Sequence, residues 1–73
     1  MTDEAVAPLE RFQAPYGRGV ELLEVRYESG MRLLRVRIRE GRRFTILDLD
    51  PSTAAHWGSA MSAWAERTEP GDP

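Results

Sequence analysis

Arginine alternates with apolar residues through the middle of this chain, and this alternation constrains the fold more than any other feature. Arg35, Arg37 and Arg39 are separated by Val36 and Ile38. A β-strand points successive side chains to opposite faces of its sheet, so the pattern predicts a strand with one apolar face and one basic face. The remaining elements are interpreted around this strand.

Three strands with short turns between them are predicted. They are expected at residues 20–27, 31–39 and 43–49. Ser29-Gly30 and Gly41-Arg42 fit two-residue turns, and glycine at the first central position of the second turn favours type II′. Residues 9–13 are a candidate for a fourth strand.

The two turns predict a register for the sheet. Leu23 is expected opposite Val36, Val25 opposite Leu34, and Val36 also opposite Leu47. Such an alternation is typical of an antiparallel sheet with one packed face. The predicted packed face consists of Leu23, Val25, Leu34, Val36, Ile38, Thr45, Leu47 and Leu49.

A helix is predicted directly after the last strand. Asp50 is a favourable N-cap and Pro51 suits the first helical position, so the helix is expected over residues 51–67. Its apolar residues recur at three- and four-residue spacing and should cover the packed face of the sheet. They are Ala54, Trp57, Met61, Trp64 and Ala65.

The expected fold class is therefore α+β, a three-stranded or four-stranded antiparallel β-meander with one C-terminal α-helix packed on one face. A single domain is expected over residues 9–68, with flexible tails at residues 1–8 and 69–73. The chain has only 73 residues and no cysteine. Because a core of this size supplies only ~3–5 kcal/mol and no disulfide can add to it, a homodimer is expected.

The face opposite the packed one mixes charge with apolar groups. All ten basic residues are arginine, although the net charge is −2. Arg35 is predicted between Glu24 and Asp48, where ion pairs form across strands. The other end is our candidate interaction face. It comprises Val20, Leu22, Arg37, Arg39, Arg42, Arg43, Phe44 and Ile46.

This candidate face allows three interpretations. It is a solvated face with some apolar groups, a surface for self-association, or a surface for a ligand or nucleic acid. Arginines beside an exposed aromatic fit single-stranded nucleic acid, but the acidic balance of the chain disfavours that partner.

The residue inventory does not favour an enzyme. His56 is the one histidine, without a cysteine or a carboxylate at metal-ligand spacing. Asp48 and Asp50 are interpreted as an arginine partner and a helix cap rather than an acid/base pair. We therefore expect no catalytic residues, no metal and no cofactor.

Two resemblances follow from these motifs. The strand from Val36, the glycine turn, the strand from Phe44 and the helix from Asp50 resemble the C-terminal part of the transcriptional coactivator family, whose members are small dimers that bind single-stranded DNA. The whole chain resembles small uncharacterised bacterial proteins that are classed as domains of unknown function. The first resemblance implies a two-fold dimer, and the second implies a compact bacterial protein.

The function expected from the sequence is a small accessory or regulatory module for protein interaction. The alternative is a single-stranded nucleic-acid-binding protein that uses the arginine-rich sheet face. No apolar run approaches the ~20 residues that a membrane span needs, so the expected location is the cytoplasm.

Overall fold

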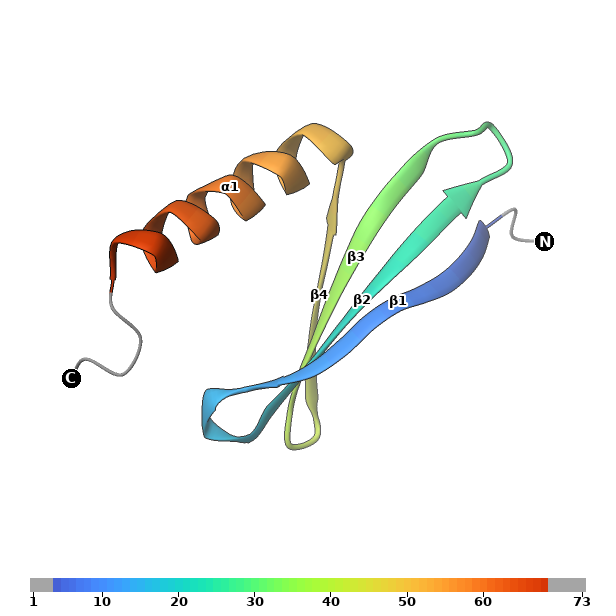
Figure 1. Cartoon of the computed structure of the whole chain (residues 1–73). Coiled ribbons are helices and arrows are strands. Elements are labelled where there is room, and N and C mark those ends of the chain that lie inside the picture. Colours follow the sequence, from blue (N-terminus) through green and yellow to red (C-terminus); the bar gives the residue numbers. More distant parts are fainter. Residues whose placement is uncertain (1–3, 69–73) are drawn as a thin grey trace.

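The computed structural model describes residues 4–68, which form a four-stranded antiparallel sheet followed by one helix (Figure 1). The strands are adjacent in chain order, and the fold is α+β as predicted. The elements are β1 (Glu4–Ala14), a 3₁₀ turn (Pro15–Gly17), β2 (Arg18–Tyr27), β3 (Arg32–Glu40), β4 (Arg43–Leu49) and α1 (Pro51–Arg67).

Strand β1 is longer than the candidate strand at residues 9–13. It begins at Glu4, so the predicted tail at residues 1–8 is wrong for residues 4–8. The ladder with β2 is interrupted by a bulge between Pro8 and Glu10. Proline has no N–H to donate, so an edge strand with a bulge is where a sheet tolerates it. The predicted tail at residues 69–73 lies outside the described residues.

The β3–β4 hairpin has the predicted register. Arg35 pairs with Asp48, Val36 with Leu47 and Arg39 with Phe44. Glu40 pairs with Arg43, which leaves two residues in the turn, and Gly41 has a φ of 62°. Positive φ at the first central position is the requirement of a type II′ turn, and glycine meets it without steric cost.

The predicted register between β2 and β3 is wrong by one residue. Val36 pairs with Leu22 rather than Leu23, and Leu34 pairs with Glu24 rather than Val25. The reason lies in the turn, where the Gly30 N–H donates to the Tyr27 carbonyl and the Tyr27 N–H donates to the Met31 carbonyl. The loop therefore contains three residues, 28–30, and Gly30 takes the positive-φ position at 95°.

Compared with the predicted register, this shift places each side chain of β2 on the opposite face of the sheet. One face, here the helix face, carries apolar side chains from all four strands, namely Phe12, Val20, Leu22, Leu34, Val36, Ile38, Leu47 and Leu49. The opposite face, here the arginine face, includes Arg11, Gln13, Glu21, Leu23, Val25, Arg35, Arg37, Arg39, Phe44, Ile46 and Asp48. Arg35, Arg37 and Arg39 share this face because alternate residues of one strand point to the same side. Phe44, Ile46 and Asp48 lie beside them because the β3–β4 register is as predicted.

Helix α1 begins where the sequence predicts. Asp50 has extended backbone angles, its Oδ1 accepts a hydrogen bond of 2.7 Å from the Thr53 N–H, and Pro51 is the first helical residue. Hydrogen bonds from Thr53 also hold the pKa of Asp50 below its usual value. The cap therefore fixes the helix start against the end of β4.

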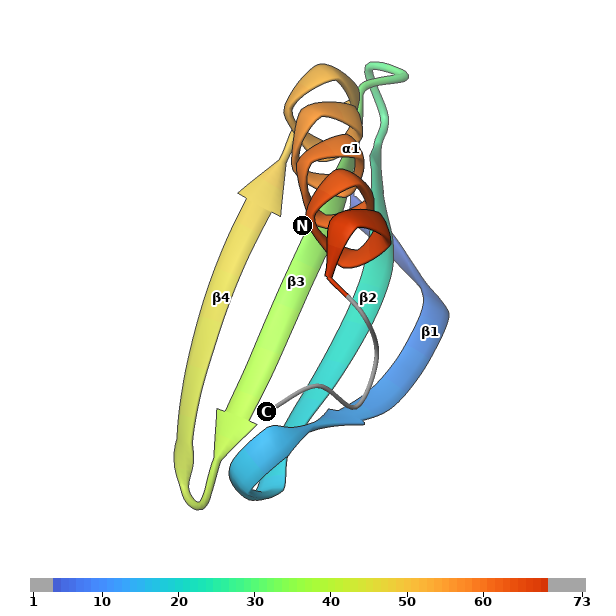
Figure 2. The same cartoon turned by 60° about the vertical axis from the view of Figure 1, so that its left-hand side comes forward.

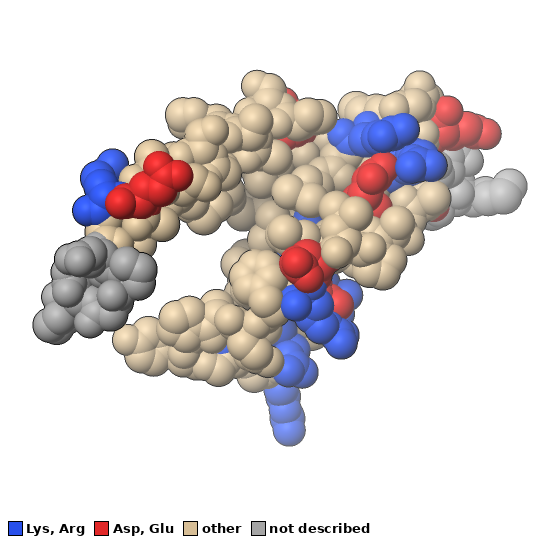
Figure 3. Space-filling view, in the orientation of Figure 1, with Lys and Arg blue, Asp and Glu red and all other residues tan. Residues whose placement is uncertain are grey.

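The helix packs against the sheet only through its first turns. Its contacts with the sheet are mainly with β3 and β4. Thr53 and Ala54 are half-buried, whereas every residue from Ala55 to Arg67 is exposed. Figures 1 and 2 show the helix leaving the sheet at an angle, and the space-filling view in Figure 3 shows an open cleft between the two. The helix is therefore packed on one face of the sheet, as predicted, and its first turns make the contact.

Few residues of the single chain are buried. Among residues 4–68, only Val25 and Leu49 are buried. The radius of gyration is 14.7 Å, against about 11 Å for a compact domain of this length. The accessible surface is 6177 Å², on the order of 1,600 Å² more than a compact monomer of this size exposes.

Glycine-to-alanine substitutions test the β2–β3 loop. Gly30→Ala should destabilise the fold by about 1–2 kcal/mol, because an L-residue is strained at positive φ. Gly58→Ala is the matched control, since a Cβ there meets open space and alanine is favoured in a helix by ~0.5–1 kcal/mol. Chemical denaturation at one protein concentration should therefore show opposite signs. A Gly30→Ala variant as stable as the parent would contradict the three-residue loop.

Candidate functional site

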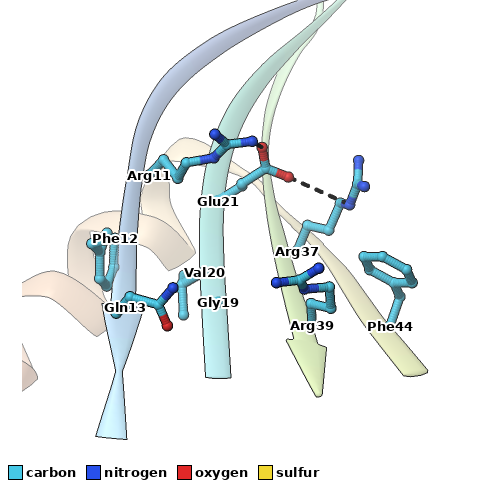
Figure 4. Close-up of a pocket in the computed structure, with 9 residues that line it drawn as sticks. All are labelled: Arg11, Phe12, Gln13, Gly19, Val20, Glu21, Arg37, Arg39 and Phe44. Atoms are coloured by element: carbon cyan, nitrogen blue, oxygen red, sulfur yellow. Dashed lines mark hydrogen bonds and ion pairs between the residues drawn. The ribbon is translucent and has the colours of Figure 1, made fainter. Parts of the chain in front are cut away.

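An open hollow lies on the arginine face, at the end of the sheet that carries the Pro15–Gly17 and Gly41–Arg42 turns (Figure 4). Its volume is about 460 Å³, and all four strands contribute to it. In Figure 4 the helix ribbon lies behind the sheet, so the hollow and the helix occupy opposite faces. The lining residues are Arg11, Phe12, Gln13, Gly19, Val20, Glu21, Arg37, Arg39 and Phe44.

Glu21 holds two of the arginines in this hollow. Its Oε2 lies 3.4 Å from Nη2 of Arg11, and its Oε1 lies 3.5 Å from Nε of Arg37. The second contact is an ion pair without hydrogen-bond geometry, because the buried Nε of Arg37 has no hydrogen-bond partner in the described part of the chain. One carboxylate on β2 thus restrains two guanidinium groups, one from each of the flanking strands β1 and β3.

Phe44 supports Arg37 from the other side. The guanidinium carbon of Arg37 lies 4.8 Å from the centre of the Phe44 ring. A cation over an aromatic face at this distance is attracted by the ring quadrupole. The ring itself remains half exposed, so the hollow offers apolar surface next to the cation.

Arg39 is the cation of the hollow that is available for a ligand. It makes no ion pair with any residue between 4 and 68. It lies opposite Gly19, and a Cβ on Gly19 would approach its Nε to 4.0 Å. This is an ordinary van der Waals distance, so the Arg39 side chain lies directly over the backbone of Gly19.

The structure separates the residues of the predicted interaction face. Arg37, Arg39, Phe44 and Ile46 lie together on the arginine face. The side chains of Val20 and Leu22 lie on the helix face instead, because of the three-residue loop, although Val20 also lines the hollow. Arg42 is in the turn, and Arg43 pairs with Glu40 on the helix-face side of the hairpin.

Two groups of the hollow were missed by sequence reasoning. Arg11 and Gln13 belong to β1, whose pairing with β2 was not predicted. Glu21 was assigned to neither face, and only the correct β2–β3 register places it opposite Arg37. Correct pairing of β1 would then have placed Arg11 opposite Glu21 and Gln13 opposite Gly19.

A separate ion-pair cluster lies on the same face, farther along β3. Arg35 binds Asp48 through two contacts, 2.8 Å from Nε to Oδ1 and 3.0 Å from Nη2 to Oδ2. Glu4 lies 3.9 Å from the same guanidinium. The hydrogen bonds from Arg35 hold the pKa of Asp48 below its usual value, and Asp48 raises the pKa of Arg35.

This cluster was predicted in part from the sequence. Asp48 is the partner of Arg35, as predicted. Glu24, the other predicted partner, lies on the opposite face of the sheet. Glu24 instead contacts Arg26 at 3.2 Å and Arg32 at 3.6 Å. Arg35 and Asp48 therefore join β3 to β4 and leave no cation there for a ligand.

Residues 4–68 contain no group of three or more histidine, cysteine or acidic side chains arranged to hold a metal ion. Asp48 is occupied by Arg35, and Asp50 caps the helix. The one helix described is neither long nor apolar enough to span a membrane.

The fold and the hollow define a small α+β domain with an arginine-rich surface on one side of its sheet. A family model matches residues 3–67, and the chain belongs to that family, a family of unknown function designated DUF6967. No curated protein and no solved structure matches the chain significantly.

The Arg35–Asp48 pair predicts a dependence of stability on pH. A carboxylate whose folded pKa is depressed adds stability above its unfolded pKa of about 3.9 and loses it as the pH falls through the folded pKa. The melting temperature should therefore drop between about pH 5 and pH 3, and Asp48→Asn should reduce that drop. Glu66→Gln, on the exposed helix, is the charge-matched control. An equal drop in the parent and in Asp48→Asn would contradict the role of this pair.

Proposed function

We propose that this protein is a non-enzymatic protein-interaction module that works as a homodimer, with a second copy covering the helix face. The observation that carries the proposal is the exposed apolar stripe of α1 beside an uncovered apolar sheet face. Trp57, Met61 and Trp64 are 40%, 62% and 56% exposed. They recur at four- and three-residue spacing and therefore share one side of the helix.

The exposed area reaches the minimum size expected of a biological interface. Phe12 and Leu47 on the helix face are 48% and 41% exposed. With the three stripe residues they offer about 500 Å² per copy, if each side chain can bury ~200 Å². Two copies would then bury about 1,000 Å² through these side chains alone, which is the lower bound for a stable interface.

A second copy is favoured because one chain supplies both halves of the contact. Each copy has an unpaired apolar helix and an open apolar sheet, so two copies related by a two-fold axis can cover each other. Such an isologous contact closes on itself and leaves no complementary surface open. The dimer would also supply the core that a chain of this length lacks.

Single-stranded nucleic-acid binding is the second candidate function. Arg37 and Arg39 beside the half-exposed Phe44 favour it, because bases stack on such platforms. The net charge of −2 opposes it. Affinity for an oligonucleotide that falls steeply as salt is added would support this function.

A pair of matched substitutions tests the dimer. Met61→Asp places a charge in the proposed interface and should convert the dimer into a monomer. Ile46→Asp makes a similar change at a residue of similar exposure on the arginine face, and should leave the dimer intact. Light scattering after size-exclusion chromatography measures both masses. A dimer that survives Met61→Asp, or one that is lost in Ile46→Asp, would contradict the placement on the helix face.

A further inference from the structure

We infer that the hollow of the arginine face binds a carboxylate of an acidic segment in a partner protein, with Arg39 and Arg37 as its recognition groups. The inference deepens the proposed function by naming the chemistry of the partner. It concerns the face opposite the proposed dimer contact, so each can fail without the other.

The hollow has a local excess of positive charge. Arg11, Arg37 and Arg39 contribute three guanidinium groups, and Glu21 is the one carboxylate that lines the hollow. The chain as a whole is acidic, with a net charge of −2. A cationic site on an acidic protein attracts an anion locally while the rest of the surface repels a long polyanion.

Most other arginines are already neutralised. Arg18 pairs with Glu40, Arg26 and Arg32 with Glu24, and Arg35 with Asp48. A single-stranded nucleic acid needs a basic groove that follows its backbone and aromatic groups for successive bases. Arg42, Arg43 and Arg67 also make no ion pair with any residue between 4 and 68, but they lie in the turn, at the start of β4 and at the end of α1. On the arginine face, the unpaired Arg39 shares one hollow with Phe44, which fits an acidic side chain and a neighbouring apolar residue better than a nucleic-acid backbone.

The cations of the hollow are held in place before a ligand binds. Arg37 is restrained by Glu21 on one side and by the Phe44 ring on the other. Its Nε is buried, whereas the side chain as a whole is 41% exposed, so an incoming oxygen atom would reach the exposed part of the guanidinium rather than Nε. The guanidinium fork matches the two oxygens of a carboxylate, and restraint reduces the entropy lost on binding.

Fluorescence anisotropy with a labelled oligoglutamate peptide tests this inference on the full chain. The peptide should bind the parent protein, and an oligoglutamine peptide of the same length should not. Arg39→Gln should weaken binding about tenfold or more. Arg39→Lys keeps the charge without the planar fork and should give an intermediate affinity. Arg67→Gln, in the last turn of the helix, removes the same charge elsewhere and should leave the affinity unchanged.

Several results would overturn the inference. They are an absence of oligoglutamate binding, an equal loss in Arg39→Gln and Arg67→Gln, or an unaltered affinity in Arg39→Gln. If a thymidine oligonucleotide binds more tightly than oligoglutamate, and this binding is also lost in Arg39→Gln, the ligand of the hollow is nucleic acid and not an acidic segment. Light scattering on the same samples separates the two proposals, because an intact dimer without peptide binding refutes only this inference.

Discussion

The alternation of arginine with Val36 and Ile38 along β3 is the constraint on which the rest of the structure depends. It assigns one apolar and one basic face to a sheet that has a single helix to cover it. Arg35 binds Asp48 across the strands, and Glu21 restrains Arg37. The basic face is stabilised by these ion pairs and also contains the buried Val25, whereas the helix contacts the apolar face only through its first turns.

The open angle of α1 follows from the same constraint. The Asp50 cap and Pro51 start the helix immediately after β4, and only its first turns contact the sheet. Beyond them Trp57, Met61 and Trp64 stand in solvent beside an apolar sheet face. Large exposed apolar surfaces are uncommon in monomers and usually mark an interface. We therefore propose assembly through the helix face and recognition through the arginine face.

Local signals in the sequence predicted the local parts of this fold. Gly41 fixed the β3–β4 turn and its register, and Asp50-Pro51 fixed the helix start. The β2–β3 register was missed because Ser29-Gly30 indicates a turn but does not determine the number of residues in the loop. Strand β1 was largely missed because Pro8 and several charged residues interrupt its alternation of apolar and polar residues. Arg11 and Gln13 were therefore not assigned to the site. Helical periodicity predicted the apolar stripe of α1, but it carries no information on which molecule covers that stripe.

The most direct test of this account is an isotope-filtered nuclear Overhauser measurement on a mixture of labelled and unlabelled protein. We expect contacts between the indole protons of Trp57 and Trp64 in one molecule and methyl protons of the helix face, such as those of Leu47, in another. These contacts would show that a second copy covers the sheet. Indole contacts confined to a single molecule, together with a monomeric mass, would contradict the central claim that this chain completes its core by self-association.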